Sequence, residues 1–101
     1  MKKAADALYL LATFSIRAQQ INKALTYAMN GVVLFPNDTR LIEIYAYALL
    51  LNGQYQEAED VLASTDISTR NAEFLRSRTA NLLDMPKEQR AARLRKYLAS
   101  D

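Results

Sequence analysis

Alanine recurs in this chain at a spacing of 34 residues. The first series consists of Ala12, Ala46 and Ala80. The second series lies twelve residues further along the chain and consists of Ala24, Ala58 and Ala92. Two interleaved series with one period are hard to obtain by chance, and a period of this length indicates stacked helical units. Small side chains let paired helices approach closely, and a larger side chain there would cost about 1–3 kcal/mol through overpacking. We therefore assign these six alanines to helix packing.

Local start and stop signals divide the chain into six expected helices, at about 4–17, 20–34, 39–51, 54–64, 70–84 and 87–99. Pro36 cannot continue a helix, and Asp38 or Thr39 can cap the next one. Gly53 can adopt the left-handed conformation that ends a helix. Pro86 fits the first turn of the last helix. The sequence thus predicts a single all-α domain over residues 1–101.

The repeated unit resembles the tetratricopeptide repeat (TPR) family. The 34-residue period, the small residue in each first helix, the segment from Gly53 to Ala58 and the closing Pro36 follow that family's pattern. The resemblance implies three antiparallel helix pairs in a short right-handed superhelical stack, with repeats at about 5–38, 39–72 and 73–101. Some positions depart from the pattern: Gln19 and Lys87 replace the glycine, Arg70 replaces the proline, and Arg76 replaces the Leu8 and Ile42 of earlier repeats.

The resemblance also implies that the first helix of each pair lines a groove that binds a partner. The apolar residues at its inward positions are Tyr9, Ile16, Tyr47, Leu50, Leu51, Phe74 and Met85. We assign these seven to the groove, because exposed apolar and aromatic surface marks interaction sites. The alternative is that they contact one another as core. The segment 41–51 is apolar nearly all round, which favours burial on every side, and a partner's helix or extended segment would complete that burial.

Composition argues against catalysis. The chain has no histidine and no cysteine, and its two glycines lie far apart. It therefore lacks the commonest general base, thiolate chemistry and a phosphate-binding loop. The acidic residues Glu57, Glu59 and Asp60 are expected to form a solvated helix face rather than a metal site. We expect no enzyme activity, no catalytic residue, no metal site and no cofactor.

Charge and hydropathy favour a protein that binds other proteins rather than membranes or nucleic acid. The net charge is +2, and basic residues gather in the helix at 87–96. We interpret that helix as a polar cap of the stack, with nucleic-acid binding as the alternative. No stretch reaches the roughly 18–20 apolar residues of a membrane span. The apolar start of the chain is bounded by Asp6 and Arg17 and lacks a convincing cleavage site. We therefore expect no membrane insertion and no nucleic-acid partner.

A more specific function comes from resemblance alone. Short, divergent TPR proteins with an apolar groove resemble the small cytoplasmic chaperones of bacterial type III secretion systems. That resemblance implies a role in protein transport and virulence, in which the chain holds a needle or export-apparatus component in a heterodimer or other hetero-oligomer. A second small helical protein would serve as co-chaperone. The alternative is a structural TPR adaptor that bridges subunits of a larger assembly.

Overall fold

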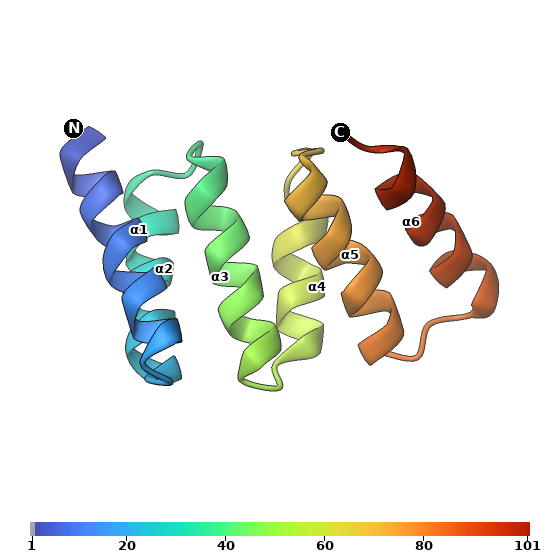
Figure 1. Cartoon of the computed structure of the whole chain (residues 1–101), viewed down its shortest axis with the longest axis horizontal. Coiled ribbons are helices and arrows are strands. Elements are labelled where there is room, and N and C mark those ends of the chain that lie inside the picture. Colours follow the sequence, from blue (N-terminus) through green and yellow to red (C-terminus); the bar gives the residue numbers. More distant parts are fainter. Residues whose placement is uncertain (1) are drawn as a thin grey trace.

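The computed structural model describes residues 2–101, with side chains from Lys3 onward, and these residues form six helices and their connections (Figure 1). They are α1 (Lys2–Arg17), α2 (Ile21–Leu34), α3 (Thr39–Leu51), α4 (Tyr55–Ala63), α5 (Arg70–Leu82) and α6 (Lys87–Ala99). These residues contain no strand, so the all-α prediction is confirmed. The expected helix boundaries agree with the observed ones to within two residues at each end. Met1 lies outside the described residues.

Consecutive helices run in opposite directions and form three pairs in a row (Figure 1). Each helix packs against the next one along the chain, and α3 also packs against α1 and α5. The first helices of the three pairs therefore lie side by side along one face. Among the described helices, α6 packs closely only against α5. The molecule is elongated as a result, with dimensions of 40 × 24 × 20 Å.

Side-chain caps set two of the helix starts. Asp38 caps α3 by accepting a hydrogen bond from the backbone N–H of Arg40 at 3.0 Å. Thr69 caps α5 by accepting a hydrogen bond from the backbone N–H of Ala72, also at 3.0 Å. Pro86 lies at the N-cap of α6, one position before the expected first turn. The Asp38 and Thr69 caps each occupy a backbone donor that a helix start would otherwise leave without a partner.

The turns inside the first two pairs use the same backbone conformation. Gly53 follows α3 with a φ of 77°, in the left-handed region that the sequence predicts for it. Gln19 follows α1 with a φ of 60°. It thus adopts the conformation of the glycine that it replaces. A side chain with a Cβ is strained in this region by about 1–2 kcal/mol, whereas glycine is not.

The packing alanines lie at the helix contacts, with one exception. The five that have no exposed surface are Ala12, Ala24, Ala46, Ala58 and Ala80. Ala92, by contrast, is exposed, so its assignment to helix packing is wrong. The physical reason is its place on α6, since no described helix follows α6 to cover the face on which Ala92 lies.

Larger side chains fill the space between the helices around α3. Leu49, Leu62 and Leu75, from α3, α4 and α5, belong to one buried cluster. On the other side of α3, Leu41 lies against Gly31 of α2, where a Cβ would come within 2.8 Å of the Leu41 Cδ2 atom. Glycine therefore permits this close approach of α3 to α2. The core runs along the row of helices and leaves both ends of the row uncovered.

Candidate protein-binding face

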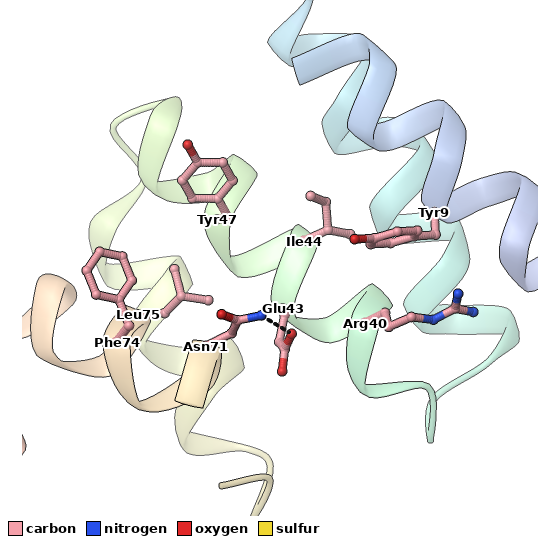
Figure 2. Close-up of a pocket in the computed structure, with 8 residues that line it drawn as sticks. All are labelled: Tyr9, Arg40, Glu43, Ile44, Tyr47, Asn71, Phe74 and Leu75. Atoms are coloured by element: carbon pink, nitrogen blue, oxygen red, sulfur yellow. Dashed lines mark hydrogen bonds between the residues drawn. The ribbon is translucent and has the colours of Figure 1, made fainter. Parts of the chain in front are cut away.

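A cavity of about 240 Å³ opens between α1, α3 and α5, the helices that lie side by side (Figure 2). Its lining residues are Tyr9 of α1, Arg40, Glu43, Ile44 and Tyr47 of α3, and Asn71, Phe74 and Leu75 of α5. The spacing of these residues is i, i+3, i+4 and i+7 on α3 and i, i+3 and i+4 on α5, which places each set on one face of its helix. One stripe from each helix therefore forms the cavity.

Aromatic and aliphatic side chains form its apolar wall. Tyr47 and Phe74 are 40% and 45% exposed, and Tyr9 and Ile44 are half-buried. The Phe74 ring meets the ring of Tyr97 on α6 edge-on, with 5.5 Å between the centroids. This contact holds Phe74 in place although much of its surface faces solvent. The wall thus leaves pre-positioned apolar surface open to solvent, and exposed apolar surface of this kind marks interaction sites.

A charged group bounds the cavity on the α1 side. The Arg40 guanidinium lies 5.1 Å from the centroid of the Tyr9 ring and donates hydrogen bonds to Asp6 at 2.8 Å and Asp38 at 3.0 Å. The hydrogen bond from Arg40 holds the pKa of Asp38 below its usual range, against a smaller effect of burial. The bonds to Asp38 and then Asp6 raise the pKa of Arg40, so the group stays charged. Two carboxylates balance this cation while it orients the Tyr9 ring.

A carboxylate bounds the cavity between α3 and α5. Glu43 accepts a hydrogen bond from the Thr69 hydroxyl. It accepts a second one from the Asn71 side-chain amide at 3.4 Å (Figure 2). Both donors belong to the start of α5, so these bonds tie α5 to α3 at the edge of the cavity. The half-buried Glu43 carboxylate can accept a further hydrogen bond from a backbone or side-chain donor of a partner.

The structure brings three of the predicted groove residues to this cavity, namely Tyr9, Tyr47 and Phe74. The other four do not line it: Ile16, Leu50, Leu51 and Met85. Leu50 is only 8% exposed and belongs to the buried cluster with Leu49 and Leu62, so its assignment to the groove is wrong. It is wrong because α4 and α5 cover that side of α3. Leu51 is 46% exposed but outside the cavity.

Besides Arg40 and Glu43, three lining residues lie outside the predicted groove set, namely Ile44, Asn71 and Leu75. Ile44 lies three positions before Tyr47, and Asn71 and Leu75 lie three before and one after Phe74. The helical spacing around the two predicted aromatic residues was the signal that could have found them. Repeat position alone does not separate residues that face the cavity from neighbours that face the core.

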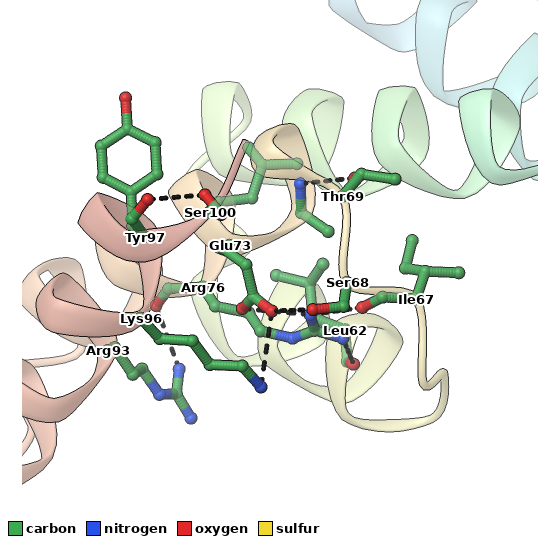
Figure 3. Close-up of polar contacts among 12 residues, drawn as sticks. Leu62, Ile67, Ser68, Thr69, Glu73, Arg76, Arg93, Lys96, Tyr97 and Ser100 are labelled. Atoms are coloured by element: carbon green, nitrogen blue, oxygen red, sulfur yellow. Dashed lines mark hydrogen bonds and ion pairs between the residues drawn. The ribbon is translucent and has the colours of Figure 1, made fainter.

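A second polar cluster lies where the loop 64–69 meets α5 and α6 (Figure 3). The Glu73 side chain is only 2% exposed. Its carboxylate accepts a hydrogen bond from the Ser68 hydroxyl at 2.7 Å and pairs with Arg76 at 3.3 Å and Lys96 at 3.4 Å. Burial alone would raise the pKa of Glu73, but the Ser68 hydroxyl and the two cations outweigh burial and lower it. Glu73 is therefore a buried, ionised group that joins three segments.

Arg76 explains one departure from the repeat pattern. Its guanidinium donates hydrogen bonds to the backbone carbonyl oxygens of Leu62 at 3.0 Å, Thr65 at 3.2 Å and Ile67 at 2.6 Å (Figure 3). These acceptors belong to the end of α4 and the loop after it, where helix carbonyls lack internal partners. An arginine at the position held by leucine and isoleucine in the earlier pairs thus anchors the α4–α5 connection.

The acidic residues of α4 behave in two ways. Glu57 and Asp60 are exposed, as expected for a solvated face. Glu59 is partly buried beside Arg93, so for this residue the expectation is wrong. Among residues 2–101, no three acidic, histidine or cysteine side chains lie in an arrangement that could hold a metal ion. None of the helices in this range combines the length and hydrophobicity needed to cross a bilayer.

The described residues define an all-helical protein with an apolar cavity on one face, bounded by Arg40 and Glu43. In comparisons with known proteins, no family model, curated protein or solved structure matches the chain.

Proposed function

We propose that the chain is a TPR-type binding module without catalytic activity. The packing of each helix on the next, and of α3 on both α1 and α5, supports this assignment. So do two ion pairs between residues one period apart, Asp6 with Arg40 and Glu59 with Arg93. Direct contact between residues separated by one period is expected where similar units stack on their neighbours.

The cavity between α1, α3 and α5 is the observation that carries a binding role. It offers the exposed rings of Tyr47 and Phe74 beside the Glu43 carboxylate, a combination that suits an apolar side chain next to a hydrogen-bond donor. Removing apolar surface from water contributes about 25 cal/mol per Å². A volume of about 240 Å³ admits one or two side chains of a partner segment and not a folded domain. The proposed ligand is therefore a helical or extended protein segment with apolar anchor residues.

In its specific form, our proposal is that the chain acts in the cytoplasm as a chaperone for a type III secretion needle or export-apparatus component. This step rests on the TPR proposal and on the resemblance of short, divergent TPR proteins to such chaperones. The cavity supports it by offering cover for the apolar residues of a small client. The chain and its client would then form a hetero-oligomer.

A structural adaptor is the second candidate. The observation that favours it is apolar surface outside the cavity, since Val33 and Leu34 at the end of α2 are 72% and 64% exposed. An adaptor would use two surfaces at once, whereas a chaperone of one client needs only the cavity. The two functions therefore differ in which side chains a partner requires.

The test is affinity capture with matched variants. Tagged wild-type protein, Tyr47→Ala, Phe74→Ala and the control Leu98→Ala are each used to capture partners from native lysate at low and high salt. Leu98 lies on α6, outside the cavity, and is 66% exposed. We expect wild type and control to retain one small partner in equal amount at high salt, and both cavity variants to lose it. Circular dichroism checks that all four proteins keep the same helix content.

Adding a Val33→Ser variant to this experiment distinguishes the alternatives. A partner that survives both cavity substitutions and is lost with Val33→Ser would favour the adaptor. Capture of nucleic acid alone, released by salt, would contradict both protein-binding functions.

A further inference from the structure

The outer face of α1 is apolar, although no described helix covers it. This face, which we call the outer α1 face, consists of Ala7, Leu10, Leu11 and Phe14. Its three large side chains are 51%, 43% and 62% exposed, in that order. A helix at the surface of a globular protein normally carries polar residues on its solvent side. Figure 1 shows α1 at one end of the row of described helices.

The 34-residue period shows what kind of surface this is. Three of its members, Ala7, Leu11 and Phe14, correspond by the period to Leu41, Tyr45 and Ala48 in α3 and to Leu75, Thr79 and Leu82 in α5. Leu41, Ala48 and Thr79 have no exposed surface, and Leu75 is only 5% exposed. They are covered because a preceding helix pair packs against α3 and against α5. The outer α1 face therefore has the register of a helix-packing surface, although no described helix packs on it.

We propose that this face packs against the same face of a second copy of the chain, with the two α1 helices antiparallel. The order of small and large side chains along the outer α1 face favours a second copy of the chain as the partner. Ala7 and Phe14 lie two helical turns apart on one stripe, with Leu10 and Leu11 midway between them. A two-fold axis at the midpoint places Phe14 of each copy over Ala7 of the other, so the contact is self-complementary.

In a head-to-tail stack, the outer α1 face of one copy would instead pack against α6 of another copy. The surface of α6 suits this contact poorly. Gly31 of α2 lies against Leu41 of α3, and buried Ala28 lies one turn before it. Their counterparts on α6 by the period are Ala99 and Lys96. Lys96 is exposed and pairs with Glu73. Covering it with Leu11 and Phe14 would remove a charged group from water without a new partner, which is costly.

Charges beside the face give the contact a distinctive salt dependence. Lys3 and Arg17 are exposed at the two ends of α1. In the antiparallel arrangement, Lys3 of each copy lies near Arg17 of the other, and like charges at the surface repel weakly. Added salt screens that repulsion and strengthens apolar contact. We therefore expect the dimer to tighten as salt rises, whereas a different partner with acidic residues at these ends would be released.

Sedimentation velocity of the full chain over a concentration series, at low and high salt, tests the proposal. One helix packed on its copy is a small interface, so we expect a reversible monomer–dimer equilibrium. Phe14→Asp should leave only monomer, and the control Leu98→Asp, of similar exposure on α6, should dimerise as wild type does. Circular dichroism checks that both variants remain folded.

A residue swap distinguishes the antiparallel contact from other modes. Ala7→Phe alone sets two phenylalanines against each other, and Phe14→Ala alone leaves a gap, so each should weaken the dimer at least tenfold. The double variant Ala7→Phe/Phe14→Ala restores one phenylalanine against one alanine and should recover most of the affinity. The proposal is overturned by a wild-type monomer throughout the series, growth beyond dimer, weakening by salt, or a double variant no better than the single ones. These outcomes do not depend on the proposed function, because the cavity lies elsewhere.

Discussion

Arg93 on α6 binds Glu59 on α4 through two parallel hydrogen bonds, one between Nη1 and Oε1 at 2.7 Å and one between Nη2 and Oε2 at 2.8 Å. The two residues are one 34-residue period apart. The hydrogen bond to Glu59 raises the pKa of Arg93 against the effect of burial. Arg93 also donates to the backbone oxygen of Arg76 at 3.1 Å. Since α6 packs closely only against α5, this one side chain links the last helix to the middle pair.

Removing the carboxylate of this pair should destabilise the fold. Glu59→Ala leaves the Arg93 guanidinium, whose side chain is 27% exposed, without its carboxylate partner and with only the Arg76 backbone oxygen as acceptor. We expect a loss of about 1–3 kcal/mol in the free energy of unfolding, measured by urea denaturation. The control is Glu57→Ala, since Glu57 is exposed on the same helix, and its effect should stay within about 0.5 kcal/mol. Equal losses in the two variants would contradict a specific role for the pair.

The buried Glu73 should make stability depend on pH. Its pKa in the folded protein lies below the ordinary value of 4.5. A carboxyl whose pKa is lowered by folding adds stability above its ordinary pKa and loses that contribution as the pH falls through its folded pKa. We therefore expect Glu73→Gln to cost about 1–3 kcal/mol at pH 7. The difference from wild type should shrink below pH 4.5.

Urea denaturation of both proteins at steps from neutral to acidic pH measures this effect. Glu88→Gln is the control, because Glu88 is exposed at the start of α6. Its curve should follow that of the wild type at every pH. A Glu73→Gln protein whose deficit is constant across the range would show that the charge of Glu73 does not contribute.

Gln19→Gly should stabilise the protein. Gln19 has a φ of 60°, which strains a residue with a Cβ, whereas Gly53 occupies the equivalent turn of the second pair without strain. The greater freedom of glycine in the unfolded chain offsets part of this gain. We expect a net increase of about 0.5–1 kcal/mol in the free energy of unfolding. Gln20→Gly, one residue later and with a negative φ, is the matched control and should destabilise slightly; stabilisation by both variants would refute the explanation.

The helices were predictable because their boundaries depend on local chemistry. Pro36, Asp38 and Gly53 each act within a few residues of a boundary, and the structure uses them where the sequence indicates. The 34-residue period likewise identifies five alanines at helix contacts. Such signals can be read without knowing which helices are neighbours.

The candidate site was only partly predictable, because its members depend on how whole helices pack. Tyr47 and Leu50 are both apolar and three residues apart on α3, yet one faces the cavity and the other the core. The sequence does not show that α4 and α5 cover the side of α3 on which Leu50 lies. The assignment of Ala92 to helix packing was wrong for a related reason, because the period does not show which faces of α6 a neighbouring helix covers.

The contrast between two adjacent leucines tests the corrected assignment. Leu50 is 8% exposed in the core cluster, and Leu51 is 46% exposed. Leu50→Ala should lower the free energy of unfolding by about 2–4 kcal/mol through a cavity in the core, and Leu51→Ala by less than about 1 kcal/mol. Chemical denaturation of the two variants measures the difference. Similar losses would show that α3 is not oriented as described.

Restoring the repeat pattern at Arg76 should harm the protein. Arg76→Leu introduces the residue found at this position in the first pair, so family resemblance alone would predict a neutral or stabilising change. In the structure, the substitution leaves the carbonyl oxygens of Leu62, Thr65 and Ile67 without this donor and removes one cation from buried Glu73.

We expect Arg76→Leu to lose about 3–5 kcal/mol, the usual result of removing one partner of a buried ion pair. Hydrogen exchange should show the loop 64–69 and the end of α4 opening first, since Arg76 anchors both. Ile42→Leu is the control at the equivalent position of the second pair, and it should change stability by less than about 1.5 kcal/mol. Because the double variant Glu73→Gln/Arg76→Leu no longer leaves a buried charge unpaired, it should lose less than the sum of the two single changes. Additive losses would show that the two residues act independently.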